Sequence, residues 1–151
     1  MTAAANVIEL DFPASSDFLA LARQVVVTAA RADGGFGEER LENLQLAVSE
    51  ACTNAIRAHC DAGSEAAIHI RCELGDGRIE VEVVDRGPGF DPELLPTLPA
   101  PTDPSRLYHE SGLGIALMQL FTDHTEISSS PLGTAVRLVL YALPNVAPGA
   151  A

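Results

Sequence analysis

Residues 78–89 are Arg78-Ile-Glu-Val-Glu-Val-Val-Asp85-Arg-Gly-Pro-Gly89, an alternating apolar and polar run that ends in an acid and two glycines. Such alternation is typical of a half-buried β-strand, and an aspartate close to glycines indicates a turn. A similar run from Ala67 to Leu74 precedes it and is joined to it by Gly75-Asp76-Gly77, which is a strong hairpin signal. We therefore expect an antiparallel hairpin whose second strand carries Asp85 to a glycine turn.

The segments on either side of this hairpin show helical or extended patterns. Apolar residues at intervals of three and four follow the first strand in two runs, which end at glycines 34 and 63. The expected elements are strands at 7–12, 67–74, 78–84, 124–129 and 134–142 and helices at about 16–33, 37–62 and 112–121. Because strands and helices do not strictly alternate, this order favours an α+β two-layer sandwich, with a mixed, mostly antiparallel sheet and its helices on one face.

One domain is expected, over residues 6–142, with flexible ends at 1–5 and 143–151. Within it, a stretch at about 90–111 contains few apolar anchors and five prolines (Pro92, Pro96, Pro99, Pro101 and Pro104). A stretch of this length without regular structure is unusual inside a domain and is often a lid or a binding loop. We therefore expect a lid between the hairpin and the third helix.

Composition narrows the classes of function. The 151 residues carry a net charge of −12 and contain no lysine, which excludes a Walker-type phosphate loop and a Schiff base. The acidic balance argues against direct nucleic-acid binding and against anionic membranes, and no apolar run approaches the ~20 residues that span a bilayer. These observations favour a protein that meets basic partner surfaces.

The cysteines and two of the histidines predict no metal site. Cys52, Cys60 and Cys72 are odd in number and lack metal-ligand spacing, so we expect reduced, buried thiols and a cytoplasmic location. His59 and His69 likewise have no partner at metal spacing. Both are expected to be packing or surface residues.

The second expected helix presents two polar groups beside its core stripe. The stripe consists of Leu41, Leu44, Val48, Ala51 and Ala55, and at 100° per residue Glu50 and Asn54 fall on its flank. An asparagine carbonyl can ligate Mg²⁺, and a carboxylate one turn away can take a proton during phosphoryl transfer. A solvated glutamate and a surface asparagine are the alternative.

Asp85 and the glycines after it offer a place for a planar base. A carboxylate at a strand end can accept a hydrogen bond from the exocyclic amine of adenine, while Gly87 and Gly89 let the backbone pass close to the ring. An ordinary turn with Asp as its first residue is the alternative.

A second glycine pair opens the third expected helix. The amides around Gly112 and Gly114 can point at a phosphate, with help from the helix dipole. Arg106 and His109, at the end of the lid, can screen phosphate charge. A glycine-rich helix start and two solvated basic residues are the alternatives.

These segments together resemble the boxes of a known superfamily. The Glu50 to Asn54 helix resembles the N box of the GHKL ATPases, Asp85-Arg-Gly-Pro-Gly89 their G1 box, and Ser111-Gly-Leu-Gly-Ile-Ala-Leu-Met118 their G2 box. Ser130-Pro-Leu-Gly-Thr134 is similar to the Gly-Thr segment that begins their last strand. The likeness covers about residues 6–142. It is greatest to the stand-alone bacterial anti-sigma factor and serine-protein kinase branch.

The resemblance implies the GHKL (Bergerat) fold with ATP and Mg²⁺ as ligands. Asn54 would bind the metal, and Glu50 would be the general base toward a serine of an anti-anti-sigma partner of the STAS type. Leu113 and Thr134 would join the glycines and Asp85 around the nucleotide. The resemblance further implies a sigma factor as a second partner and a homodimer, and it places Arg23 where relatives contact their partners.

The resemblance also leaves two functions open. The leading hypothesis is an ATP-dependent kinase that phosphorylates the anti-anti-sigma partner and sequesters a sigma factor. The other is a catalytically weak or inactive module that binds ATP and protein without phosphotransfer. Two departures from the family pattern are visible. The place four residues after Asn54, where relatives often carry histidine, holds Ala58, and His59 follows. Just before the G2 glycines, where relatives often carry lysine or arginine, the chain has His109-Glu110-Ser111.

Overall fold

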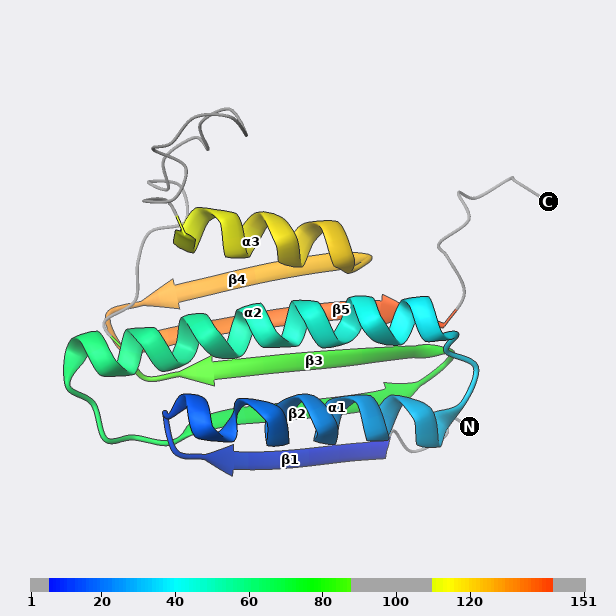
Figure 1. Cartoon of the computed structure of the whole chain (residues 1–151), viewed down its shortest axis with the longest axis horizontal. Coiled ribbons are helices and arrows are strands. Elements are labelled where there is room, and N and C mark those ends of the chain that lie inside the picture. Colours follow the sequence, from blue (N-terminus) through cyan, green and yellow to red (C-terminus); the bar gives the residue numbers. More distant parts are fainter. Residues whose placement is uncertain (1–5, 88–109, 143–151) are drawn as a thin grey trace.

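A single sheet backs three helices in the computed structural model, which describes residues 6–87 and 110–142 (Figure 1). The described strands are β1 (Asn6–Phe12), β2 (Ile68–Gly75), β3 (Arg78–Asp85), β4 (His124–Ser130) and β5 (Gly133–Tyr141). The helices are α1 (Leu19–Asp33), α2 (Glu38–Ala62) and α3 (Glu110–Phe121), and a short 3-10 turn, η1 (Ser16–Phe18), precedes α1. In Figure 1, α1, α2 and α3 lie along one face of the sheet, with α2 between the other two. The α+β two-layer sandwich with its helices on one face is confirmed.

The sheet has the strand order β1-β2-β3-β5-β4. Each of its four pairings is antiparallel. The sequence predicted a mixed, mostly antiparallel sheet, but no parallel pairing is found among the described strands. The β2–β3 hairpin turns through Asp76 (φ 54°) and Gly77 (φ 70°), as its sequence predicts. Since β5 lies between β3 and β4, the start of β5 meets the end of β3, where Asp85 pairs with Thr134.

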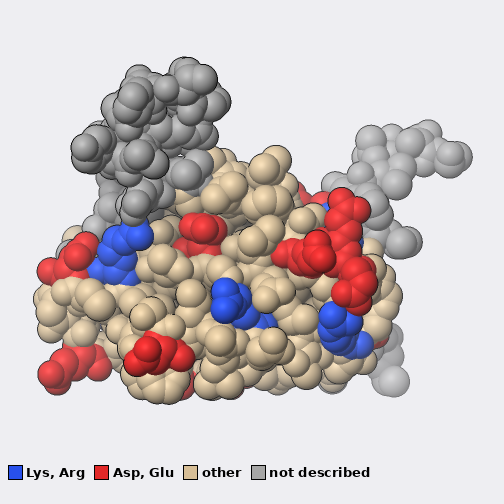
Figure 2. Space-filling view, in the orientation of Figure 1, with Lys and Arg blue, Asp and Glu red and all other residues tan. Residues whose placement is uncertain are grey.

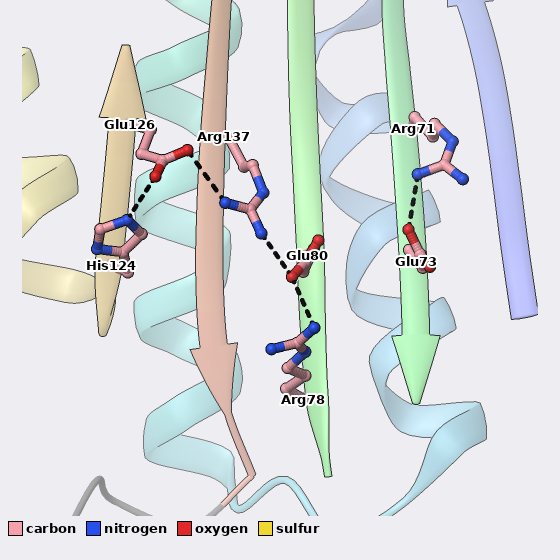
Figure 3. A network of polar contacts seen from close by, with 7 residues as sticks. All are labelled: Arg71, Glu73, Arg78, Glu80, His124, Glu126 and Arg137. Carbon is pink, nitrogen blue, oxygen red and sulfur yellow. Dashed lines mark hydrogen bonds and ion pairs between the residues drawn. The ribbon is translucent and has the colours of Figure 1, made fainter. Parts of the chain in front are cut away.

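The two faces of the sheet differ in chemistry. Residues of β2 and β3 alternate between buried and half-buried positions, and the buried set packs under the helices with a core that includes Leu44, Val48, Ile70, Val81 and Leu138. The other face carries charged side chains paired along and across strands (Figure 3): Glu80 accepts from Arg78 of its own strand and from Arg137 of β5, and Arg137 also donates to Glu126 of β4. This alternation is what a sheet covered on one side requires.

The long helix α2 begins and ends as the sequence indicates. Gly37 precedes it, Glu38 and Glu39 occupy its first turn, where the helix dipole favours acids, and Gly63 ends it in the left-handed conformation (φ 66°). Figure 2 shows the helical face, with acidic side chains gathered over the end where α2 begins. Its 25 residues place Glu50 at its midpoint and Asn54 one turn later.

Several boundaries and environments differ from expectation. Helix α3 starts at Glu110, so residues 110 and 111 are helical rather than part of the lid, and the rest of the lid at 90–109 lies outside the described residues, as do the ends at 1–5 and 143–151. Cys52 and Cys72 are buried, whereas Cys60 is exposed, because the apolar stripe does not extend to its side of α2. In the described ranges, no helix is both long and apolar enough to cross a bilayer.

Candidate nucleotide site

One flank of α2 forms the floor of the predicted site. Glu50, Asn54 and Ala58 are each half-buried and follow one another at intervals of four, which places them on one side of the helix. Their neighbours Ala51 and Ala55 are buried, with 1% and 2% of their surface exposed. The flank position expected for Glu50 and Asn54 is therefore what the structure has.

Gly114 brings α3 against that flank. A Cβ atom at this glycine would lie 3.0 Å from Oε2 of Glu50, 3.2 Å from Nδ2 of Asn54 and 3.5 Å from its Oδ1. The predicted base, the predicted metal ligand and one predicted phosphate-binding glycine therefore meet at one point. Only glycine leaves that point unobstructed.

Asp85 belongs to β3, and the turn that follows it contacts α2 one helical turn beyond Asn54, at Ala58. Asp85 ends β3 with 7% of its surface exposed, and its Oδ1 accepts a 2.9 Å hydrogen bond from the amide of Gly87. A Cβ atom at Gly87 would lie 3.0 Å from Cβ of Ala58, so the glycine turn packs directly on α2.

The start of β5 completes the surroundings of Asp85. Thr134 pairs with Asp85 across the sheet, is 6% exposed and shares a 2.7 Å hydrogen bond with the Ser129 hydroxyl. Gly133 approaches so closely that a Cβ atom there would collide with the carbonyl oxygen of Asp85, and its φ of 148° is one that other residues rarely adopt. Sequence reasoning included Thr134 but gave no role to Gly133.

His59 is the main residue that sequence reasoning missed. It is fully buried, and its ring bonds to the carbonyl of Ala66 and to the amide of Arg86. Of the two positions expected for it, packing or surface, the structure has the packing one, but the two hydrogen bonds of its ring were not expected. A signal existed, because His59 stands four residues after Ala55 and so continues the core stripe of α2.

Other predicted residues lie elsewhere or outside the described part. Gly89, Arg106 and His109 are outside the described residues, and of Gly112 and Leu113 the structure describes only the backbone, in the first turn of α3. Arg23 lies in α1, and α2 separates α1 from α3, the helix of Gly114 (Figure 1). The pKa of the buried Cys52 thiol is raised to about 12, chiefly by burial and also by Cys72, while the charge of Arg23 acts to lower it.

The donor set fits a metal that comes with its nucleotide. In residues 6–87 and 110–142, no group of three or more His, Cys, Asp or Glu side chains could hold a metal ion. Mg²⁺ often takes only one or two protein ligands and completes its shell with phosphate oxygens and water. The side-chain amide of Asn54 lies beside Gly114 of α3, and its carbonyl oxygen is a ligand of the kind that this mode of binding uses.

A separate hollow of about 610 Å³ is lined by Asp11, Ala66, Ala67, His69, Val84 and Arg86. None of these was predicted as a site residue. The hollow adjoins the end of β3 but does not include Glu50, Asn54 or Asp85.

Comparison with known proteins identifies the family of this chain. Residues 12–140 match the family described as the histidine kinase-like ATPase domain. The chain belongs to this family. Family membership makes it an ATPase-type nucleotide-binding domain.

Curated relatives match nearly their whole length. An anti-sigma F factor of Caldanaerobacter subterraneus is 37% identical over 139 residues, which cover 90% of this chain and 94% of the relative. A serine-protein kinase RsbW of Bacillus velezensis is 28% identical over 144 residues, covering 93% of this chain and 89% of the relative.

A solved structure has the same fold. It contains the RsbU and RsbW domains of a Mycobacterium tuberculosis protein and superposes with a TM-score of 0.64 at 17% identity. The match covers 90% of this chain and 32% of that longer chain. At this identity the likeness concerns the fold alone.

Proposed function

We propose that this chain is an ATP-binding anti-sigma regulatory factor that phosphorylates a serine of an anti-anti-sigma partner and sequesters a sigma factor. The observation that carries the proposal is the meeting of Glu50, Asn54 and Gly114 at one point. The names of the relatives, serine-protein kinase and anti-sigma F factor, support the choice of reaction and of partners.

Asp85 is proposed to recognise the base. Its Oδ1 accepts from the Gly87 amide at 2.9 Å, which restrains the rotation of the carboxylate. A carboxylate accepts through both oxygens, so Oδ2 remains to accept from the exocyclic amine of adenine. Thr134, paired with Asp85, forms the neighbouring wall.

Asn54 and Glu50 are proposed to handle the phosphates and the proton. ATP with Mg²⁺ supplies the transferable phosphoryl group. The Asn54 carbonyl would help to hold the metal ion. Glu50 accepts the proton of the partner's serine hydroxyl as that oxygen attacks the terminal phosphorus of ATP, and ADP leaves as the bond from that phosphorus to the bridging oxygen breaks; accepting this proton is the role of a general base in phosphoryl transfer.

The finer parts of the proposal concern assembly and place. We propose a homodimer, a STAS-type antagonist, a cytoplasmic location and Arg23 as a partner contact. The net charge of −12 supports association with basic partner surfaces.

The test of Glu50 as the general base uses Glu50→Gln. We expect this variant to bind ATP as the wild type does and to transfer labelled phosphate to its partner about 100-fold more slowly or worse. Glu42→Gln, on an exposed position of the same helix, is the matched control and should transfer normally. Normal transfer by Glu50→Gln would reject the assignment, and ATP binding by a wild type that never transfers phosphate would favour the inactive module.

The test of the base pocket uses Asp85→Asn. ATP with Mg²⁺ should raise the melting temperature of the wild type, and Asp85→Asn should remove that shift because an amide nitrogen replaces one acceptor. Asp76→Asn is the control, since residue 76 is exposed in the hairpin turn with φ 54°, a conformation that asparagine tolerates. If saturating ATP leaves the wild-type melting temperature unchanged, the nucleotide site is wrong.

A further inference from the structure

His59 links three segments that meet behind Asp85. The side chain comes from the last turns of α2, is fully buried, and bonds to two backbone groups. Its Nδ1 lies 2.9 Å from the carbonyl oxygen of Ala66, just before β2, and its Nε2 lies 2.8 Å from the amide nitrogen of Arg86, just after β3.

The two backbone partners fix the tautomer of the ring. The Arg86 amide can only donate, so Nε2 must accept, and the Ala66 carbonyl can only accept, so Nδ1 must carry the proton. His59 is therefore a neutral imidazole protonated on Nδ1. If the proton were on Nε2 instead, Nε2 and the Arg86 amide would be two donors facing each other, and Nδ1 and the Ala66 carbonyl oxygen would be two acceptors facing each other.

The Arg86 amide belongs to the peptide group that follows Asp85. That peptide is planar, so holding its N–H at Nε2 of His59 also orients the Asp85 carbonyl. The same carbonyl is approached closely by Gly133, and the Asp85 side chain is tied to the Gly87 amide. These three contacts hold the turn in addition to the packing of Gly87 on Ala58, and His59 provides the one of the three that is a hydrogen bond from α2, the helix of Glu50 and Asn54.

We infer that His59 is a positioning residue that holds Asp85 in the orientation for base recognition and so sets selectivity for adenine. The inference rests on the proposed function, because it assigns to Asp85 the contact with the exocyclic amine. His59 acts through the turn and does not touch the base itself. A histidine that only filled the core would affect stability and leave the choice of base unchanged.

The test compares ATP with inosine triphosphate, whose base carries a carbonyl oxygen in place of the exocyclic amine. The dissociation constant for inosine triphosphate divided by that for ATP measures the contact at Asp85, because the contacts to phosphate are common to both nucleotides. We expect His59→Leu to lower this ratio about tenfold, which is the value of one charge-assisted hydrogen bond. His59→Gln, which offers an acceptor to the Arg86 amide, should restore most of it, and His69→Leu, at a half-buried position on the outer face, should leave it unchanged.

The outcomes separate the two claims. If the wild type binds neither nucleotide, both the proposed function and this inference are overturned. If the wild type prefers ATP and His59→Leu keeps the same ratio, or if the glutamine variant loses it equally, only the role of His59 is overturned.

A measurement on the wild type covers the case in which His59→Leu does not fold. The ¹⁵N resonance of Nε2 in His59 reports the strength of the bond from the Arg86 amide. It should move on addition of ATP and move less with inosine triphosphate, since only ATP engages Asp85. Identical responses to the two nucleotides would overturn the inference.

Discussion

Replacing Gly114 by alanine sets two physical effects against each other. Alanine is the better helix former by about 1 kcal/mol, and Gly114 lies within α3, so the change favours the helix. The new methyl group, however, would lie 3.0 Å from Oε2 of Glu50 and 3.2 Å from Nδ2 of Asn54, closer than ordinary van der Waals contact. Both atoms are the far ends of flexible side chains, so they can give way by a few tenths of an ångström.

The structure therefore predicts a variant that folds but works poorly. We expect the free energy of unfolding to stay the same or rise by up to about 1 kcal/mol, as measured by urea denaturation. The displaced groups are the proposed base and the proposed metal ligand. Since a displacement of about 1 Å in a catalytic group can reduce the rate about 100-fold, a shift of a few tenths should reduce phosphate transfer by about tenfold.

The assay combines two readouts on the same preparations. Isothermal titration with ATP, with and without Mg²⁺, follows binding, and labelled phosphate follows transfer to the partner. Gly37→Ala is the control, because a Cβ atom there meets nothing within 4 Å. A Gly114→Ala variant with wild-type Mg²⁺-dependent binding and wild-type transfer would refute the claim that α3, Glu50 and Asn54 share one site.

Two further predictions concern ionisable pairs. The hydrogen bond to Asp11 raises the pKa of His69. This pair therefore stabilises the folded state fully below about pH 6.5, the ordinary pKa of histidine, and the stabilisation is lost as the pH rises through the raised pKa. Asp11→Asn should flatten this pH dependence of the melting temperature, and an unchanged profile would contradict the prediction. Asp123→Ala removes a carboxylate, 13% exposed, that accepts from Arg40 at 2.8 Å and from the Tyr141 amide at 2.8 Å, and should cost about 3 kcal/mol in urea denaturation. Glu38→Ala, which breaks an ion pair between side chains that are 54% and 73% exposed, should cost far less, and equal losses would refute the reasoning from burial.

Local patterns in the sequence predicted most of the fold. Periodicity and glycines located the helices and strands within a few residues, because hydrophobic spacing and turn conformations are decided by neighbours along the chain. The start of α3 was placed two residues late, since Gly112 suggested a helix start where the chain was already helical. The strictly antiparallel pairing depends on where β5 enters the sheet, and no local pattern encodes that.

The candidate site was predictable in part for the same reason. The angular position of Glu50 and Asn54 on α2 follows from helix geometry alone. Their meeting with Gly114 was expected only from the resemblance, because it joins segments 60 residues apart. The bonds of His59 and the close approach of Gly133 depend on three-dimensional packing, and the periodicity of one helix gives no information about the backbone groups at its side.

The charged network on the outer face of the sheet has a consequence for how the molecule meets other proteins. Its arginines, Arg71, Arg78 and Arg137, are matched by three glutamates, Glu73, Glu80 and Glu126 (Figure 3). With His124 neutral, these residues sum to zero, so the whole surplus of −12 belongs to residues outside the network. Those other residues will therefore govern the long-range attraction of a cationic protein, and adding salt will slow its association. The paired residues of the network contribute no net charge to this attraction.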